Sequence, residues 1–307
     1  VIADPTSGLR ELLGPLLISD PERVLASNKP QLVLRLGEVP VGRFWRDLEK
    51  SPEVEVLSVT RTGFSGLARE STVIKGDVGR VLRGLGEVGE LGDSIDILKA
   101  SRSRWGQIEQ LLEAFPDSEP GMVRTLSIYA SVADSLYLGN SLPIREWGQF
   151  AQRDYPVENV RANRGANGID GQLSTWMGLT HGLDGSWCVL GDLTALYDMS
   201  APLLLDGCEG KGRVISVINN GGGRIFDRLP GVKKMSEPTQ QIVSNEHEFS
   251  FKGWAEMFGL DYTCVRSADE IEIDTIDATQ VVELVPCKKQ TEDFWAAYAA
   301  LEISEEI

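Results

Sequence analysis

The chain has 307 residues, which is enough for two ordinary domains. It is 42% hydrophobic and 25% charged, as globular proteins are, and its net charge of −16 argues against a general nucleic-acid-binding or anionic-membrane-binding surface. With only two histidines, a metal site built from several imidazoles is excluded. No apolar run reaches the roughly 20 residues of a membrane-spanning helix, and no signal peptide is visible. The four cysteines are widely spaced without a C-x-x-C motif, so we expect reduced thiols and a cytoplasmic protein.

The stretch from residue 1 to about residue 116 predicts a first α/β unit. Short apolar runs bounded by proline or glycine predict strands, and apolar residues recurring at helical spacing predict helices. The predicted elements are strands at 31–36 and 54–59, helices at 44–50 and 103–115, and a glycine-rich strand, helix and loop over 76–92. The glycine-rich segment has no G-x-G-x-x-G after a clear strand, so we assign it no cofactor.

Turn-forming residues at 116–121 predict a boundary, and a second α/β unit follows. Its predicted strands are 135–138, 187–190, 214–218, 262–265 and 281–285, and its predicted helices are 122–133, 171–182, 195–205, 253–259 and 292–303. Pro202 is expected to bend or shorten the third of these helices. Because strands alternate with helices, we predict two doubly wound α/β domains with parallel central sheets, covering 1–118 and 119–307.

Three loops of the second unit point to one site. They are Asn163–Gly171 (NRGANGIDG), Gly191–Asp198 (GDLTALYD) and Val217–Phe226 (VINNGGGRIF). In an open parallel sheet, the loops at the carboxyl ends of neighbouring strands meet in one crevice. Asp192 and Asn220 would offer there the hard oxygen ligands that Mg²⁺ takes, and the glycines would let backbone amides approach a phosphate. These residues predict a Mg²⁺-bridged pyrophosphate site.

Each loop taken alone also has a plain structural interpretation. Gly191 and Asp192 could simply begin a helix, and Asn219 with its neighbours could form an ordinary turn. The separation of 28 residues between Asp192 and Asn220 leaves room for one crossover helix between adjacent parallel strands. Order and spacing together therefore favour the metal site.

The combination resembles the thiamine-diphosphate motif, in which Gly-Asp-Gly is followed one crossover later by Asn-Asn. Leu193 stands where that motif has its second glycine. The three loops, together with Gly139–Arg145 (GNSLPIR), are similar to one branch of that group, the menaquinone-pathway enzyme 2-succinyl-5-enolpyruvyl-6-hydroxy-3-cyclohexene-1-carboxylate synthase (SEPHCHC synthase). The similarity is specific from Gly139 to Pro230. Before residue 121 it rests on domain order and on fragments such as Ala3–Arg10 (ADPTSGLR).

The resemblance implies a central domain followed by a domain that binds diphosphate and metal. Asp192, the Asn220 side chain and the Gly222 carbonyl would ligate Mg²⁺, with Mn²⁺ as an alternative ion, and the ion would hold thiamine diphosphate. Ile169 would be the apolar wedge under the bent cofactor, although by itself it reads as an ordinary core residue. The residues implied to contact cofactor are Gly165, Ile169, Asp192, Leu193, Thr194, Asn220, Gly222 and Ile225.

Ser141, Arg145 and Arg164 lie in loops beside the metal motif. Most arginines are simply solvated, but guanidinium groups suit planar carboxylates, and the substrates that the resemblance implies, 2-oxoglutarate and isochorismate, each carry two. We therefore predict Arg145 and Arg164 as carboxylate clamps, with Ser141 as a hydrogen-bond donor. The other substrate contacts implied are the apolar Ile225, Phe226 and Leu229, which could equally be core residues, and Arg43 from the first domain.

The resemblance implies a thiamine-diphosphate-dependent transferase of menaquinone biosynthesis. As a carboligase, it would decarboxylate 2-oxoglutarate and add the succinyl-semialdehyde carbanion equivalent to isochorismate. Members of the family carry an activating glutamate in an N-terminal pyrimidine-binding domain, contributed across a dimer interface. The sequence begins at Val1, so we expect a C-terminal two-domain fragment that lacks that domain, holds no catalytic residue of its own and does not turn over alone. The intact enzyme is expected to be a homodimer or homotetramer.

Other interpretations stay open at this point. The chain could belong to another thiamine-diphosphate-dependent decarboxylase or carboligase, or it could be a non-catalytic module that keeps a cofactor fold. A nicotinamide-binding domain is disfavoured because Arg164–Gly171 is not a G-x-G-x-x-G and no convincing acidic ribose partner follows it. His181 is an isolated histidine that forms no Ser-His-Asp or Cys-His pattern.

Overall fold

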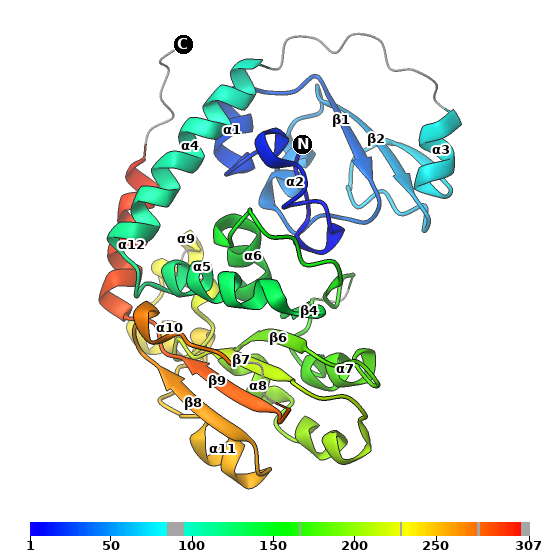
Figure 1. Cartoon of the computed structure of the whole chain (residues 1–307). Helices are drawn as coiled ribbons and strands as arrows, with labels where there is room; N and C mark the ends of the chain where they lie inside the picture. The colour runs from blue at the N-terminus through cyan, green and yellow to red at the C-terminus, as the bar shows by residue number, and fades with distance from the viewer. Residues whose placement is uncertain (85–94, 166, 228, 275–276, 302–307) are drawn as a thin grey trace. The chain divides into compact units, whose positions relative to one another are not determined.

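The chain forms two compact units, each built on a parallel sheet (Figure 1). The computed structural model describes residues 1–84, 95–165, 167–227, 229–274 and 277–301. Among these residues, the first unit comprises Val1–Asp4 and Leu13–Gln107, and the second comprises Pro5–Leu12 and Ile108–Leu301. The predicted α/β class with two parallel sheets is therefore confirmed, whereas the predicted domain limits stay a prediction.

The first unit folds around a three-stranded sheet in the order β1-β2-β3, and both neighbouring pairs are parallel. Trp45 packs against Val54, Val56 and Leu67 in a buried cluster on one side of this sheet. The strands are β1 (Leu32–Leu36), β2 (Glu55–Thr60) and β3 (Thr72–Lys75), and the helices are α1 (Pro21–Ser27), α2 (Arg43–Asp47), α3 (Val78–Gly84) and most of α4 (Ile95–Ala114). The predicted strand-helix-strand crossover is present as β1, α2 and β2.

Two elements of the first unit differ from expectation. β3, in which no residue is fully buried, was not predicted. α4 begins at Ile95 rather than at residue 103. Of the elements predicted over 76–92, α3 is present, and residues 85–92 lie outside the described part of the chain.

A buried ion pair fixes α4 to the start of α1. Arg104 donates from Nε to Asp20 Oδ2 at 2.8 Å, and its Nη2 lies 2.7 Å from the same oxygen. Asp20 is the N-cap residue of α1, with φ of 44°, and Pro21 follows it. Both side chains are at most 4% exposed, so removing either partner would leave a buried charge without compensation.

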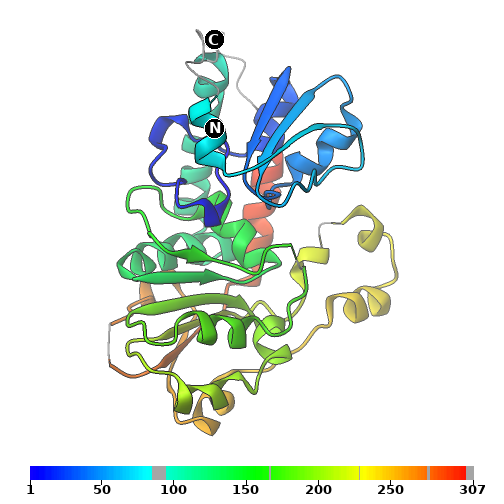
Figure 2. The same ribbon diagram turned by 90° about the vertical axis from the view of Figure 1, so that its right-hand side faces the viewer.

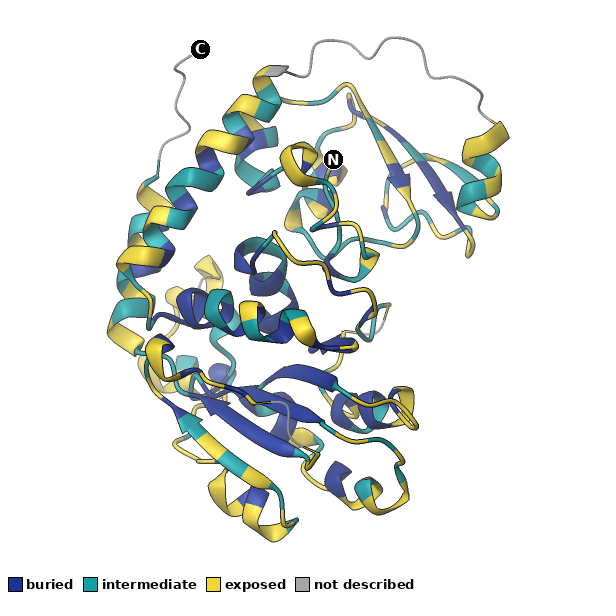
Figure 3. Cartoon of the chain, viewed as in Figure 1, coloured by how far each residue is buried: buried dark blue, intermediate teal, exposed yellow. Residues whose placement is uncertain are grey.

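The second unit folds around a six-stranded sheet in the order β5-β4-β6-β7-β9-β8, parallel throughout. The strands are β4 (Ser135–Leu138), β5 (Val160–Arg161), β6 (Ser186–Gly191), β7 (Val214–Ile218), β8 (Asp261–Val265) and β9 (Gln280–Leu284). Each of the five predicted strands is present within one residue at either end, and the short β5 is additional. The inner strands β4, β7 and β9 are buried along their whole length, and β6 is buried up to Gly191 (Figure 3).

Helices cover both faces of the second sheet, as a doubly wound fold requires (Figures 1 and 2). They are α5 (Glu119–Tyr129), α6 (Leu142–Phe150), α7 (Gln172–Leu179), α8 (Asp192–Tyr197), α9 (Pro230–Lys233), α10 (Glu237–Ser244), α11 (Lys252–Met257) and α12 (Lys288–Ala300). Side chains alternate between the faces along each strand. Cys188 and Leu190 therefore share a core with Trp176 of α7 and Trp254 of α11, whereas Trp187 points to the opposite face.

One predicted helix of the second unit is wrong. The helix expected over 195–205 is instead two short helices, α8 and a 3-10 helix at Ala201–Gly207. Pro202 lacks a backbone N–H and fixes its own φ, so it stands at the start of the second helix, where no intrahelical donor is needed. α12 begins at Lys288, before the predicted residue 292.

The order of the strands creates a switch point in the second sheet. After β4 the chain moves to β5 on one side, and it returns as β6 on the other side of β4. In open α/β sheets, ligands bind in the crevice at such a point, outside the carboxyl ends of the strands. Within the described residues, no helix has both the length and the apolar character needed to cross a membrane.

The buried Arg10 attaches the segment Pro5–Leu12 to the second unit. Its guanidinium donates to the carbonyl oxygens of Gly148 at 3.3 Å, Ala151 at 2.5 Å and Gln152 at 2.7 Å, where α6 ends. Arg10 is 1% exposed, and Glu11 is its ionic partner. Burial lowers the pKa of Arg10, an effect that the Glu11 carboxylate opposes.

We predict that Arg10→Leu lowers the free energy of unfolding of the second unit by about 3 kcal/mol or more, because three buried carbonyls lose a charged donor. Arg61→Leu is the control: Arg61 is 79% exposed in its ion pair with Asp77, and we expect a change within about 0.5 kcal/mol. Calorimetric melting of both variants measures the difference, and equal effects would contradict the role of Arg10.

Candidate functional site

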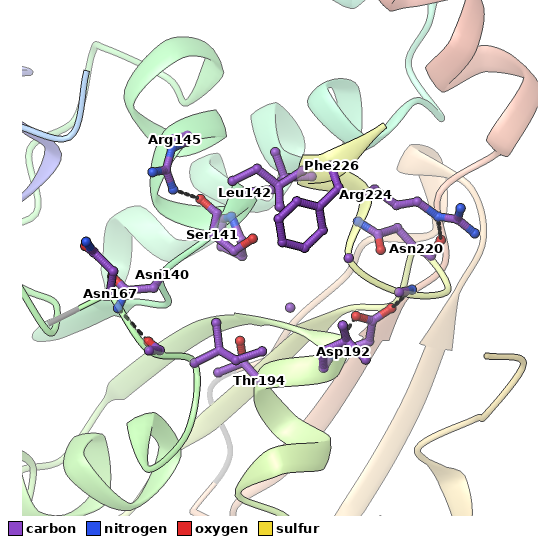
Figure 4. A pocket seen from close by; sticks show the side chains of 18 of the residues that line it. Asn140, Ser141, Leu142, Arg145, Asn167, Asp192, Thr194, Asn220, Arg224 and Phe226 are labelled. Atoms are coloured by element: carbon purple, nitrogen blue, oxygen red, sulfur yellow. Dashed lines mark hydrogen bonds between the residues drawn. The ribbon is translucent and has the colours of Figure 1, made fainter. Parts of the chain in front are cut away.

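A pocket of about 460 Å³ lies at the carboxyl ends of β4, β5, β6 and β7. Each of these strands contributes the loop that follows it, so the pocket occupies the switch-point crevice of the second sheet. Figure 4 shows Asp192 and Asn220 on one side of this pocket, and Ser141 and Arg145 on the other.

Asp192 links the loops after β6 and β7. It is the first residue of α8 and is 2% exposed. Its Oδ2 accepts the backbone N–H groups of Gly221 and Gly222, both at 2.8 Å, and its Oδ1 accepts the N–H of Leu193 at 2.6 Å. Burial raises the pKa of this carboxyl, and the backbone donors and His247 oppose that shift.

His247 approaches the same carboxylate from a distant part of the chain. Its Nε2 lies 3.3 Å from Asp192 Oδ2, while its Nδ1 accepts the N–H of Phe249 at 3.2 Å. Because Nδ1 accepts, a neutral imidazole must carry its proton on Nε2, which places an N–H toward Asp192.

The two asparagines after β7 point in different directions. Asn219 donates from Nδ2 to Glu283 at 2.6 Å and to the carbonyl of Phe249 at 2.7 Å, so it holds the loop to β9. Asn220 donates from Nδ2 to Glu119 Oε1 at 2.9 Å. Its Oδ1 is buried and accepts no hydrogen bond from the residues that the structure describes.

Gly222 allows the loop after β7 to turn tightly beneath the pocket. Its φ is 134°, and a Cβ at this position would lie 2.6 Å from the carbonyl oxygen of Ser244. Only glycine combines that backbone conformation with so close an approach. Arg224 secures the same loop by donating to the carbonyl of Asn220 at 3.1 Å and to Glu246 at 2.8 Å.

The donor set of this pocket fits a hard divalent cation. A buried carbonyl oxygen without a partner is costly, and a cation beside Asn220 Oδ1 would satisfy it. Asp192, in the same pocket, supplies a carboxylate. Across the described residues there is no group of three or more His, Cys, Asp or Glu side chains able to hold a metal. A cation here would therefore depend on amide and backbone oxygens besides one carboxylate, which suits Mg²⁺.

The opposite side of the pocket carries cationic groups. Ser141 joins β4 to α6 with φ of 73° and ψ of −129°, a conformation that is sparsely populated for residues other than glycine. Arg145 donates from Nη1 to the Ser141 carbonyl at 2.5 Å. Arg164 lines the pocket, and its Nε has no hydrogen-bond partner within the described part of the chain.

Most of the predicted site residues line this one pocket. They are Ser141, Arg145, Arg164, Ile169, Asp192, Leu193, Thr194, Asn220, Gly222, Ile225 and Phe226. Gly165 and Leu229 are not among the lining residues, and Leu229 is 47% exposed at the start of α9. Arg43 belongs to α2 of the first unit.

Sequence reasoning missed several residues of the pocket. Asn140 donates from Nδ2 to the Gly168 carbonyl at 2.8 Å and so joins the loops after β4 and β5. Its place in GNSLPIR could have identified it. Glu119 and Arg224 also line the pocket, but Glu119 lies 101 residues from Asn220 and no local pattern connects them.

No protein-family model matches the chain. Two curated proteins named SEPHCHC synthase are similar to it. The protein of Akkermansia muciniphila is 47% identical over 295 residues, which cover 95% of this chain and 55% of the relative. The protein of Bdellovibrio bacteriovorus is 40% identical over 286 residues, covering 91% and 51%. The chain thus spans about half the length of the curated relatives it matches.

One solved structure also matches. It is an X-ray structure from Mycobacterium smegmatis, provisionally described as a thiamin diphosphate-dependent enzyme, with a TM-score of 0.52 at 17% identity over 83% of this chain and 49% of that chain. At that identity the match shows the fold alone. Similarity to the two curated relatives extends over nearly the whole of this sequence and over about half of each relative, so the chain resembles that part of the SEPHCHC synthases.

Proposed function

We propose that this chain forms the part of a SEPHCHC synthase that holds the diphosphate end of thiamine diphosphate through a divalent cation. One observation carries the proposal: the Asp192 carboxylate and the unpartnered Asn220 Oδ1 occur in the same pocket, at the switch point of a parallel sheet. The names of the two curated relatives supply the activity.

The proposed metal ligands are Asp192, Asn220 Oδ1 and the Gly222 carbonyl. Mg²⁺ prefers six oxygen ligands, so phosphate oxygens and water would complete the shell, and Mn²⁺ could replace it. Leu193 and Thr194 line the pocket beside Asp192 and are proposed to contact the cofactor.

Thiamine diphosphate, when bound, would supply the electron sink that stabilises the negative charge left when 2-oxoglutarate loses carbon dioxide. The chain itself supplies an apolar lining to the pocket. Ile169, Ile225 and Phe226 line the pocket, and we propose that they support the cofactor rings and exclude water. Gly165 and Leu229 are proposed as further contacts from the flanking loops.

The cationic side of the pocket is proposed to bind the substrate carboxylates. Arg145 and Arg164 would each present a planar guanidinium to an anionic oxygen pair. Arg145 is oriented by its bond to the Ser141 carbonyl. Ser141 would donate from its hydroxyl.

The overall reaction that we propose is the one named for the relatives. 2-Oxoglutarate is decarboxylated, and the remaining four-carbon unit is joined to isochorismate on the route to menaquinone, which makes the protein a transferase. We also propose a cytoplasmic homodimer or homotetramer; the location rests on the widely spaced cysteines and the assembly on the family resemblance.

We predict that Asn220→Ala weakens thiamine diphosphate binding at fixed Mg²⁺ by about 10-fold or more. Asn220 is a proposed metal ligand, and even the loss of a residue that only orients a metal ligand typically lowers metal affinity by about that factor. Asn28→Ala, in the first unit, is the control and should leave the dissociation constant unchanged. Isothermal titration calorimetry measures both. An Asn220→Ala protein with normal affinity would remove the metal assignment.

Arg164→Ala should weaken binding of 2-oxoglutarate by about 10-fold or more in the presence of cofactor and Mg²⁺, because a hydrogen bond to a charged group is worth about 1.5–3 kcal/mol. Arg161, on β5, is exposed, so Arg161→Ala is a matched control with the same loss of charge. Titration with 2-oxoglutarate compares the two variants. If both variants lose affinity equally, the loss comes from the change in net charge and not from a direct contact between Arg164 and the substrate carboxylate.

Ser141→Gly should raise the free energy of unfolding by about 1 kcal/mol, because glycine adopts the observed backbone conformation without strain. Ser141→Ala keeps the strain and should be neutral, since the Ser141 hydroxyl makes no cap hydrogen bond with α6. Calorimetric melting tests both. A destabilised Ser141→Gly variant would show that this backbone is not strained.

A further inference from the structure

Glu119 reaches the pocket from a distant part of the chain and is held firmly there. It is the first residue of α5 and is 2% exposed. Its backbone N–H donates to Thr291 Oγ1 at 2.9 Å. The neighbouring Asp117 exchanges two hydrogen bonds with Gln290, one from its N–H at 3.0 Å and one to its Oδ2 at 2.9 Å. The start of α12 therefore fixes the position of Glu119.

The Glu119 carboxylate determines which way the amide of Asn220 faces. Asn220 Nδ2 donates to Glu119 Oε1 at 2.9 Å, so the N–H side of the amide faces the carboxylate. With Nδ2 engaged by Glu119, Oδ1 is left buried without a partner.

The unpartnered oxygen points to a ligand rather than to a simple turn. A turn that only needed to be stable would gain nothing from a buried acceptor without a donor, because such an acceptor loses its hydrogen bonds to water and is destabilising. Arg224 does not satisfy it, because that guanidinium binds the Asn220 backbone carbonyl and Glu246 instead. A divalent cation beside Asn220 would satisfy the oxygen.

We propose that Glu119 is a positioning residue for the metal: it holds the Asn220 amide so that Oδ1 faces the cation bound at Asp192. This inference rests on the proposed function, and it concerns a residue that acts through Asn220 rather than as a ligand. Outer partners of this kind orient metal ligands in many sites, and their loss typically costs about 10–100-fold in metal affinity.

The test measures Mn²⁺ affinity by electron paramagnetic resonance of the free ion, with thiamine diphosphate present, on the full chain. Glu119→Leu keeps the volume but removes the acceptor, and we expect about 10–100-fold weaker Mn²⁺ binding. Glu119→Gln keeps an acceptor oxygen without the charge, and we expect it to retain affinity within about threefold, since a neutral hydrogen bond still fixes the amide. Glu256→Gln removes an exposed charge from α11 and should have no effect.

A double-mutant cycle separates orientation from charge. If Glu119 acts through Asn220, the variant Glu119→Leu/Asn220→Ala binds Mn²⁺ no more weakly than Asn220→Ala alone. If the charge of Glu119 acts directly on the cation, the double variant loses further affinity, and the inference is wrong. Equal losses in Glu119→Gln and Glu119→Leu would overturn it as well.

Folding and the proposed function are controlled separately. Circular dichroism melting checks each variant. If Glu119→Leu does not fold, Glu119→Gln decides alone: affinity near that of the unmodified chain supports positioning, and a loss as large as that of Asn220→Ala refutes it. If the unmodified chain binds no Mn²⁺ with thiamine diphosphate, the proposed function fails. If the unmodified chain binds Mn²⁺ and Glu119→Leu binds it equally well, the positioning role is wrong but the proposed function stands.

Discussion

The pocket depends on one carboxylate that holds two loops together. Asp192 directly follows β6 and accepts the backbone N–H groups of Gly221 and Gly222, which follow β7. Because β6 and β7 are adjacent and parallel, this side chain needs to span only one strand spacing. The same contact fixes the loop that carries Asn220, which lines the pocket. Asp192 is thus the residue that joins the loops after β6 and β7.

Features encoded locally could be predicted from the sequence. The β-branched run before Asn219 and the apolar run before Gly191 gave the strands β6 and β7, and their parallel pairing brought Asp192 and Asn220 to one pocket. The family resemblance added Ser141, Arg145 and Arg164, which line the same pocket.

Features set by long-range packing could not be predicted. Glu119 meets Asn220 only because α12 holds the start of α5, and neither sequence neighbourhood records that contact. His247 contacts Asp192 although the segment that contains α9 and α10, drawn in yellow in Figure 2, separates it from β7 in the sequence. The break at Pro202 was visible as a proline, but its effect on helix length depended on tertiary context.

The attachment of Arg10 has a consequence for the order in which the chain is made. Pro5–Leu12 leaves the ribosome well before α6, whose terminal carbonyls Arg10 binds, and residues of the first unit are synthesised in between. The second unit is therefore discontinuous along the polypeptide, and it cannot close while only its earliest segment exists. Contacts between residues far apart in the sequence slow folding. The first unit would therefore have time to fold before the carbonyl groups that Arg10 binds have been synthesised.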